Sequence, residues 1–425
     1  MRTYICFAII IAASASLAAQ EREQEAIRRC RNLLETSLVD FYLPHCVDPI
    51  HGGYLEKLDE AGQFASGEKF LTLQARQLWF FSLLAKEGIQ RDPALKAAKS
   101  GHDFLMAHFH DKEEGGFFTK TTGDGTPSDR RKHVYPNAFV IYSLVEYHRA
   151  SGNADALAQA TELFNVLEEH CHDKRFGGYQ EFFYADWSPI LDPKESGYVG
   201  AINTKTYNSH LHLLEAFTEL YEATHNPLVG QRLSELILIN TATVKHPSLP
   251  CNIDGWTREW KMIESERNLR ASYGHDVECA WLVLEASKAL GRPTNLLKNW
   301  AKSICDYSIE YGFDHQHGGF CYTGPLASNS DDRQKVWWTQ AEAMVAMLTM
   351  YEMTDDDHYL DLFHNTFEFT DAHLVAKEGS WWNTRNADGT QGENKSRTSM
   401  WQAGYHNGRA LLRCEEILKR ISQTK

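Results

Sequence analysis

Apolar residues recur at helical spacing over twelve stretches of the chain, as expected for helices that bury one face. Six stretches come before a short glycine-containing turn, and six come after one. Those before the turns span 21–42, 93–109, 154–171, 228–244, 295–311 and 357–374, and those after them span 71–87, 137–150, 206–224, 277–290, 337–353 and 401–419. The sequence therefore predicts twelve helices in six pairs.

The turns repeat along the chain, each as a glycine followed closely by an aromatic residue, at intervals of 61 to 78 residues. Their first glycines are Gly52, Gly115, Gly177, Gly255, Gly318 and Gly379. Short alternating segments such as 115–119 and 177–183 predict small hairpins at one end of the helices. Repeated helix pairs either stack into an open solenoid or close into a ring. Both chain ends are helical and no polar capping repeat is present, so we expect an all-α, closed (α/α)6 barrel as a single domain over 20–425.

The segment 1–19 has one Arg, an apolar run over 4–13 and small residues that end at Ala18 and Ala19. This is the pattern of a secretory signal peptide, so we expect cleavage near Ala18/Ala19 and a periplasmic or secreted location. No later segment has eighteen uninterrupted apolar residues, which argues against a membrane anchor. The formal net charge of −14 argues against nucleic acid as a partner. We expect an exported, soluble protein that is a monomer or a weak dimer.

Eight cysteines follow the signal segment without a CxxC motif or a regular spacing. They are Cys30, Cys46, Cys171, Cys251, Cys279, Cys305, Cys321 and Cys414. Export permits disulfides, but this spacing is not that of a disulfide scaffold. We expect buried free thiols.

The helices after the turns begin with polar or aromatic residues where an ordinary inner helix would be apolar. In chain order these residues are Arg76, Tyr135, Asn137, Asn208, His212, Glu215, His275, Glu278, Trp338, Glu342, Trp401 and His406. They recur at nearly the repeat period, so a closed barrel should gather them at one mouth. Charged residues such as Arg76 and Glu278 are costly to bury without a partner or a purpose. We therefore place the candidate site at this mouth.

The histidines could instead be metal ligands or hydrogen-bonded core residues. His210 and His212 are two residues apart, so on a helix they point to different faces and cannot clamp one ion. His212 with Glu215, and His275 with Glu278, do share a face, but neither pair belongs to an HExxH or comparable ligand set. A single histidine could be a core residue, whereas several near one mouth favour a site. We expect no catalytic metal.

Large aromatic faces lie among these polar residues, in Trp338, Trp401 and the pair Trp381 and Trp382. Any one of them could serve core packing. Together they suit a sugar, whose ring faces stack on aromatic side chains while its hydroxyls need fixed hydrogen-bond partners. The chain has no GxGxxG, Walker or GxSxG motif. We expect a small-molecule sugar, either a disaccharide or a monosaccharide, and chemistry without a cofactor.

Six segments together resemble the N-acylglucosamine 2-epimerase superfamily, and most closely its cellobiose 2-epimerase branch. They read LQARQLWFFS, VYPNAFVIYSLVEYH, YNSHLHLLEAFTELYE, SYGHDVECAWLVLEA, VWWTQAEAMVAML and WQAGYHNGR. The resemblance runs from Arg76 to Arg409 and keeps the order and spacing of the motifs. It implies an (α/α)6 barrel and an inversion of C2 of a reducing-end sugar, which interconverts glucose and mannose units without a cofactor.

The resemblance also implies roles for single residues. It places two proton-transfer histidines at His275 and His406. It places substrate-binding residues at Arg76, Tyr135, Asn208, His212, Glu278, Trp338 and Trp401. The chain reads WQAGYHN where the branch usually reads WKCPYHN, and Asn137 where a Gln is common, so the identity of the sugar stays open.

The chemistry of such an inversion suits these residue types. Loss of the C2 proton requires the open-chain aldehyde, so that the carbanion spreads into an enediolate. A base must reach one face of C2 and an acid the other, and histidine suits both roles because its ordinary pKa of about 6.5 is close to working pH. Arg76 can hold the developing oxyanion. Glu278 can orient His275 or bind a hydroxyl.

Three other functions remain open from the sequence. An aldose–ketose isomerase of the mannose isomerase type would share the scaffold and the enediolate but return the proton to C1. A glycoside hydrolase or lyase could draw on Glu215, Glu278 and Glu342, but two carboxylates would not explain the paired histidines. A glycan-binding protein would need the aromatic residues and could dispense with His275 and His406.

Overall fold

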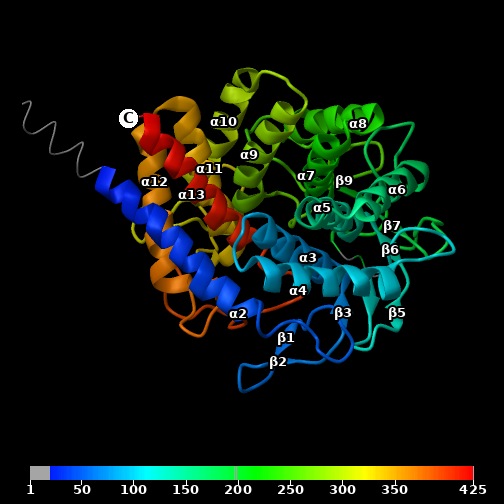
Figure 1. Ribbon diagram of the computed structural model, residues 1–425. Coiled ribbons are helices and arrows are strands. Elements are labelled where there is room, and N and C mark those ends of the chain that lie inside the picture. The colour runs from blue at the N-terminus through cyan, green and yellow to red at the C-terminus, as the bar shows by residue number, and fades with distance from the viewer. Residues whose placement is uncertain (1–19, 196, 198, 425) are drawn as a thin grey trace, which may run out of the picture.

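A computed structural model describes residues 20–195, 197 and 199–424 (Figure 1). The expected signal peptide, 1–19, lies outside the described residues. Six inner helices surround a common axis, and consecutive inner helices pack against each other. They are α3 (Leu71–Lys86), α5 (Val134–Ser151), α7 (Tyr207–Thr224), α9 (Tyr273–Ala289), α11 (Trp337–Thr354) and α13 (His406–Thr424). This is the arrangement of the expected (α/α)6 barrel.

An outer helix precedes each inner helix, and we call each such pair with the turn between them a unit. The outer helices are 20–33 continued by η1 (Leu34–Val39) and α2 (Asp40–Tyr42), α4 (Arg91–Phe104) with η2 (Leu105–Phe109), α6 (Ala154–His170), α8 (Pro227–Leu238) with η3 (Ile239–Thr243), η4 (Thr294–Leu297) with α10 (Lys298–Gly312), and α12 (Asp357–Phe369) with η5 (Thr370–Leu374). The inner and the outer helices differ in how much of their surface is buried. Every residue of α3 from Leu71 to Ala85 is buried, whereas α4 buries a single stripe that includes Ala94, Ala97 and Ala98.

The ring closes between the first inner helix and the segment that leads into the last one. The backbone N–H of Gly404 donates to Gln77 Oε1 (3.2 Å), and Arg76 Nη1 donates to the carbonyl of Trp401 (2.8 Å). The N-terminal helix lies beside α13 and α12 (Figure 1), where Arg31 pairs with Glu415 at 2.9 Å. Both ends of the chain therefore belong to one wall of the barrel.

Short strands surround the end of the barrel at which the inner helices begin. They are β1 (Lys57–Leu58), β2 (Phe64–Ala65), β3 (Lys69–Phe70), β4 (Lys120–Thr121), β5 (Pro127–Asp129), β6 (Lys132–His133), β7 (Phe182–Phe183), β8 (Lys205–Thr206), β9 (Gly255–Trp256), β10 (Arg270–Ser272), β11 (Thr323–Pro325), β12 (Lys335–Val336) and β13 (Thr384–Arg385). The strand before an inner helix pairs with a strand of the next unit, as in β3–β4, β6–β7, β8–β9, β10–β11 and β12–β13. These small antiparallel sheets tie neighbouring units together around the mouth.

A buried lysine fastens several turns to the helix that follows. In the first unit Lys69 Nζ donates to Asp48 (2.8 Å) and to the carbonyl of Gly52 (2.7 Å). The equivalent contacts are made by Lys132, Lys205 and Lys335. The glycine pairs of these four turns have positive φ, for example 79° and 68° at Gly52 and Gly53, a conformation that favours glycine.

The fourth turn lies elsewhere than the sequence predicted. Gly255 belongs to β9, and the bridge equivalent to Val47–Tyr54 of the first unit joins Lys245 to Asn252. The glycine pair is replaced there by a loop that contains Pro250, and Gly255 is the next glycine along the chain. The assignment of Gly255 as the fourth turn was wrong, although the number of units was right.

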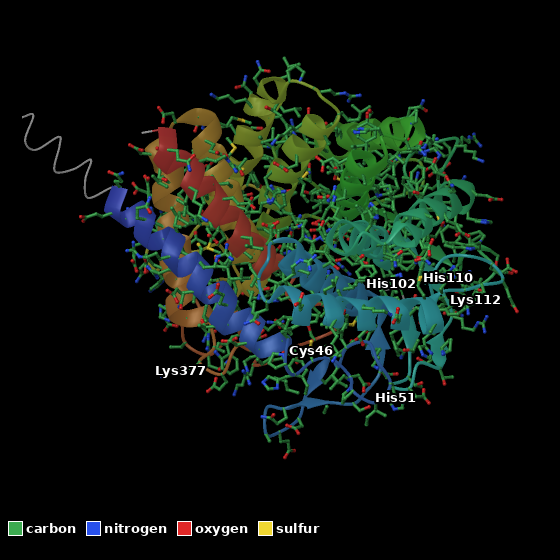
Figure 2. All side chains as sticks on the ribbon, viewed as in Figure 1. Cys46, His51, His102, His110, Lys112 and Lys377 are labelled. Atoms are coloured by element: carbon green, nitrogen blue, oxygen red, sulfur yellow. The ribbon has the colours of Figure 1, made fainter. Side chains whose placement is uncertain are left out.

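Two further expectations concern single features of the chain. Figure 2 shows Cys46 where α2 passes into the first turn, and this cysteine, like the other seven among the described residues, is buried and unpaired. The expectation of buried free thiols is therefore confirmed. No helix in the described part of the chain is long and apolar enough to cross a membrane.

Candidate active site

A cavity of about 450 Å³ opens at the mouth where the inner helices begin. It is lined by eight of the twelve residues that the sequence placed at the mouth, and every unit contributes at least one of them. These lining residues are Arg76, Tyr135, Asn208, His212, His275, Trp338, Trp401 and His406. Asn137, Glu215, Glu278 and Glu342 do not line the cavity.

The cavity is electropositive although the chain is acidic. None of its described lining residues is Asp or Glu, whereas Arg76 and Arg267 both line it. The inner helices also point their N-terminal ends toward this mouth, where the helix dipole is positive. Such surroundings stabilise a negative charge that develops on a bound molecule, as on the oxygen of an enediolate.

His275 is the third residue of α9, and its Nδ1 lies 2.7 Å from Ser272 Oγ. Its ring packs on Trp338, with the centroids 4.6 Å apart. A side chain at Gly274 would come within 2.8 Å of Trp338, so this glycine permits the close approach of α9 to α11. Burial, together with His212 and Arg76, lowers the pKa of His275 to about 3. His275 is therefore neutral at physiological pH, with Nε2 as its free ring nitrogen.

His406 is the first residue of α13 and has a different partner. Its Nδ1 lies 2.6 Å from Glu342 Oε1, and its ring also packs against Trp338, at 5.5 Å between centroids. Burial, together with Arg76 and Arg409, lowers the pKa of His406 well below its ordinary value. His275 and His406 thus have Nδ1 held by the protein, which leaves Nε2 available to a bound molecule. The third cavity histidine, His212, has its Nδ1 3.0 Å from Glu215 Oε2.

Glu278 lies behind the wall of the cavity and is fully buried. Its carboxylate accepts a hydrogen bond from Arg409 Nη2 (2.9 Å), which also donates to Glu342 (2.8 Å). The expectation that Glu278 orients His275 is wrong, since Ser272 holds that ring and Glu278 Oε1 lies 3.8 Å from Nδ1 of His406 instead. The physical reason is depth, because a residue three positions after His275 lies about one turn further into the barrel. The role of Glu278 in binding a sugar hydroxyl stays a prediction.

One group of side chains in the described residues has the spacing of a metal site. Ligand atoms of Glu278, Glu342 and His406 lie within 4.8 Å of one another. However, Nη2 of Arg409 already donates to both carboxylates. Burial raises the pKa of Glu278 well above its usual value and raises that of Glu342, whereas a divalent ion needs ionised ligands. The group fits an arginine better than it fits a metal.

Arg76 and the third-unit residues complete the cavity wall. Arg76 Nη2 donates to the Tyr135 hydroxyl at 2.7 Å, so the tyrosine fixes the guanidinium beside the histidines. Asn208 leaves its side-chain oxygen without a protein partner, although that atom is buried. His212 faces the cavity, while His210 turns away to bind the carbonyl of Thr206 (2.7 Å). The two histidines diverge as expected.

Several lining residues escaped the sequence analysis because they lie on loops. Arg267, Tyr322, Asn383 and Val199 have no helical periodicity to mark them. Two of these residues, Tyr322 and Asn383, share a position in the hairpins that the sequence could have revealed. Tyr322 and Asn383 each come two residues after the aromatic residue that forms the turn bridge, Phe320 and Trp381 respectively.

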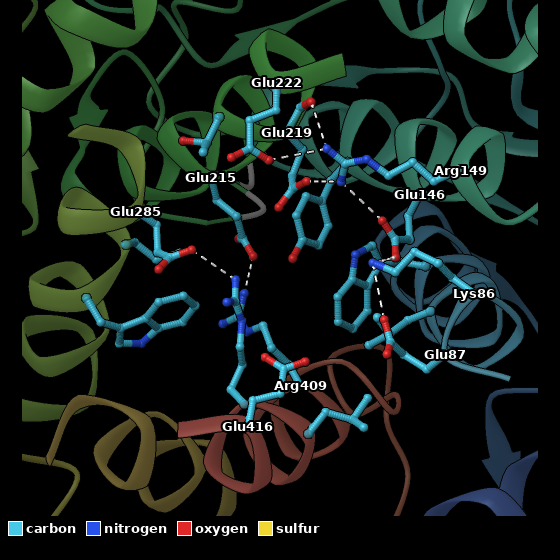
Figure 3. Close-up of a pocket in the computed structure, with 18 residues that line it drawn as sticks. Lys86, Glu87, Glu146, Arg149, Glu215, Glu219, Glu222, Glu285, Arg409 and Glu416 are labelled. Carbon is cyan, nitrogen blue, oxygen red and sulfur yellow. Dashed lines mark hydrogen bonds and ion pairs between the residues drawn. The ribbon is translucent and has the colours of Figure 1, made fainter. Parts of the chain in front are cut away.

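A second cavity, of about 300 Å³, lies at the opposite end of the barrel, where the inner helices end. Figure 3 shows that its charged side chains bind one another. Lys86 pairs with Glu146 at 2.7 Å, and Arg413 pairs with Glu285 at 3.1 Å. These contacts link neighbouring helices, and Arg409, which lines this cavity together with Glu215, binds Glu278 and Glu342. We therefore assign the chemistry to the mouth.

The fold and the mouth together define a helical barrel in which three histidines, His212, His275 and His406, face one cavity that lacks carboxylates among its described lining residues. The chain belongs to the N-acylglucosamine 2-epimerase (GlcNAc 2-epimerase) family, whose model matches residues 53–409. It is an isomerase-class carbohydrate enzyme, as its relatives are.

Three relatives indicate the range of the family. A cellobiose 2-epimerase from Bacteroides fragilis is 30% identical over 394 residues, which cover 91% of this chain and 96% of that protein. The structure of cellobiose 2-epimerase from Spirochaeta thermophila has a TM-score of 0.85 at 32% identity and covers 94% of this chain and 98% of that one. A D-mannose isomerase from Marinomonas mediterranea is 26% identical, over 90% of this chain and 94% of that protein. The expected (α/α)6 fold class is confirmed.

Proposed function

We propose that the chain is a cofactor-independent sugar 2-epimerase. It inverts C2 of the reducing-end glucose or mannose unit of a β-1,4-linked disaccharide or a related sugar. The observation that carries the proposal is the pair His275 and His406, each with Nδ1 bound by the protein and Nε2 free at one cavity. Inversion needs a proton taken from one face of C2 and another delivered to the opposite face, and two such histidines supply both steps.

In the proposed mechanism the sugar binds with its ring opened. One histidine removes the C2 proton while the negative charge moves onto the aldehyde oxygen, and the enediolate collapses as the other histidine protonates the opposite face. Arg76 faces this cavity and stabilises the oxygen that carries the charge. Trp338, which contacts both histidine rings, offers a flat face to the sugar.

The alternative functions fit the cavity less well. A hydrolase requires two carboxylates beside the scissile bond, whereas Glu215, Glu278 and Glu342 bind Arg409 behind the wall. Family 76 glycoside hydrolases share the fold alone, at 10 and 11% identity. An aldose–ketose isomerase would use the same cavity, and a D-mannose isomerase is among the relatives, so this remains the second candidate.

Isotope labelling separates the two candidates. The protein is incubated with cellobiose, mannobiose or mannose in heavy water, and the products are analysed by NMR. A histidine exchanges its proton with solvent quickly, so an epimerase should place deuterium at C2 of the epimer and leave C1 unlabelled. A ketose with deuterium at C1 would identify an isomerase and contradict the proposal. Turnover should be unchanged after exhaustive chelation, because Arg409 takes up the potential ligands Glu278 and Glu342.

Substitution of the histidines tests the assignment of the bases. His275→Ala and His406→Ala should each abolish epimerisation and leave the circular dichroism spectrum unchanged. His51→Ala, at an exposed turn residue, is the matched control and should keep full activity. Wild-type turnover in either cavity variant would rule out the two-histidine scheme.

We also propose that the protein is exported after removal of residues 1–19. The support is the sequence pattern of that segment, with its apolar run and the small residues at Ala18 and Ala19. N-terminal sequencing of the protein from the periplasm or the medium should find a start close to residue 20. Recovery of the full-length chain from the cytoplasm alone would contradict export.

A further inference from the structure

Ser272 occupies a helix-capping position but does not cap the helix. It is the N-cap residue of α9, where a serine hydroxyl ordinarily accepts a hydrogen bond from a free backbone N–H of the first turn. No such bond is made by Ser272. Its Oγ instead lies 2.7 Å from Nδ1 of His275, the third residue of the same helix.

The third unit provides an internal comparison. Thr206 is the N-cap residue of α7, and its Oγ1 accepts a hydrogen bond from the backbone N–H of Ser209, the third residue of that helix, at 3.0 Å. The N-cap position thus carries a hydroxyl in both the third and the fourth unit, but the hydroxyl binds a different group in each. Where the third helical residue is a serine the hydroxyl caps the helix, and where it is His275 the hydroxyl binds the imidazole.

We propose that Ser272 is a positioning residue that fixes the ring of His275 so that Nε2 exchanges the C2 proton with the sugar. This inference rests on the proposed function and deepens it. A hydroxyl can donate or accept, so Ser272 can serve Nδ1 in either tautomer. An ionised carboxylate can only accept and would favour the charged imidazolium.

The Nδ1 atoms of His406 and His275 have different hydrogen-bond partners, and this difference explains why a serine holds His275. Glu342 holds His406, whereas among the described residues the ring of His275 has a hydrogen bond to Ser272 and none to a carboxylate. The neighbouring Asp276 is bound on another side, where it accepts from the backbone N–H of Asn252 (3.3 Å). The ionisable groups that act on His275 from other helices are His212 of α7, Arg76 of α3 and His406 of α13. All of these groups favour the neutral form of the His275 ring. Ser272, as a neutral partner at Nδ1, preserves that form.

Substitution of Ser272 tests the proposal through kcat. Ser272→Ala should lower kcat roughly 10- to 100-fold, because a base displaced by a fraction of an ångström loses alignment with C2. KM should change less than about threefold, since Ser272 does not line the cavity. Ser272→Thr, which keeps the hydroxyl, should restore most of kcat. Ser303→Ala, which removes a hydroxyl from α10, is the matched control and should behave as the wild type.

Two measurements separate positioning from capping. Ser272→Ala should lower the unfolding midpoint less than Thr206→Ala does, because it removes the hydrogen bond to His275 but no helix cap. Ser272→Asp keeps a side chain able to cap α9 but places a carboxylate at Nδ1. It should raise the pKa of His275 and move the acid limb of kcat/KM upward by about one unit or more, since the protonated ring is no base.

The 15N chemical shifts of the His275 ring provide a readout that needs no turnover. In the wild type they should report a neutral ring with a hydrogen-bonded Nδ1, and Ser272→Ala should shift the Nδ1 resonance. Unchanged shifts with wild-type kcat in Ser272→Ala would overturn the inference, as would a fall in kcat explained by lost stability. An inactive wild type would overturn the proposed function instead, and the shifts would still test the contact.

Discussion

Arg409 lies among three buried carboxylates, those of Glu215, Glu278 and Glu342. Burial alone would raise the pKa of Glu215, but Arg409 and His212 lower it to about 2, so this carboxylate is ionised. Burial raises the pKa of Glu278 well above its usual value, and the nearby Glu342 adds to the effect. One guanidinium therefore stabilises one full negative charge and holds two further carboxyl groups below the histidines.

Removal of this guanidinium should be severely destabilising. Arg409→Met leaves Glu215 as a buried charge without its main partner, and we expect the free energy of unfolding to fall by roughly 3 to 5 kcal/mol. Arg413→Met is the matched control on the same helix, because its partner Glu285 and Arg413 itself are both 37% exposed. That variant should lose less than about 1 kcal/mol. Urea unfolding measures both, and similar losses in the two variants would show that Arg409 has no special role.

Sequence reasoning succeeded for residues whose position on a helix face decides their location. His212 and His210 fall on opposite sides because they are two apart, as the structure shows. Sequence reasoning failed for Glu278, because periodicity gives the face of a helix on which a side chain lies and not its depth in the barrel. Arg267 was missed for a different reason, since a loop residue reaches the cavity through a backbone path that no periodic pattern describes.

Each inner helix is anchored to its turn by one side chain. In the first five units the fourth helical residue accepts a hydrogen bond from the backbone N–H of the bridge residue in the turn. These anchors are Gln74, Asn137, His210, Asp276 and Gln340. In the sixth unit Gln402 binds the carbonyl of Trp381, and this anchor lies before α13 rather than within it.

The anchors show that His275 and His406 are not at equivalent positions in their units. His275 comes directly before its anchor Asp276, whereas His406 comes four residues after Gln402, so Trp401 is the counterpart of His275. The sixth unit differs because the first turn of its inner helix is unwound, and α13 begins at His406 instead of residue 401. The unwound segment still brings His406 to the cavity.

The lysine that fastens the first turn should contribute strongly to stability. Lys69 and Asp48 have side chains that are 1% and 3% exposed, so Lys69→Met leaves a buried aspartate without its cation. We expect a loss of roughly 3 to 5 kcal/mol in urea unfolding. Lys120→Met is the control, because Lys120 pairs at 2.8 Å with Glu68, which is 46% exposed. A loss below 1 kcal/mol in Lys69→Met would mean that the turn is held by its backbone conformation alone.

At the scale of the whole molecule, burial sets the protonation of many groups before any substrate binds. Burial lowers the pKa of several histidines to about 3 or 4. They are His133, His210, His212, His275 and His364. In the unfolded chain each returns to about 6.5, so below that pH the unfolded chain binds more protons than the folded one. Stability should therefore fall as the pH drops below about 6.5.

Buried carboxyl groups give the opposite dependence. Burial raises the pKa of Glu56 to about 8, although its Oε1 accepts hydrogen bonds from Gln74 Nε2 (2.9 Å) and the backbone N–H of Phe70 (2.6 Å). Glu181 is raised to about 8 for the same reason. The folded protein then holds protons that the unfolded chain releases above about pH 4.3, so stability should fall as the pH rises from there to 8.

Between about pH 4.3 and 6.5 these two sets of groups oppose each other. The five histidines outnumber the two carboxyl groups, so stability should rise with pH up to about 6.5 and decline above it. Urea unfolding at pH 4, 6.5 and 8 should show the largest free energy at 6.5. Glu56→Gln removes one ionisation and should flatten the decline between pH 6.5 and 8, by as much as roughly 2 kcal/mol. Glu60→Gln, at an exposed position of the same hairpin, should leave the decline unchanged. If Glu56→Gln kept the full decline, Glu56 would already be ionised in the folded protein at pH 6.5, against the effect of its burial.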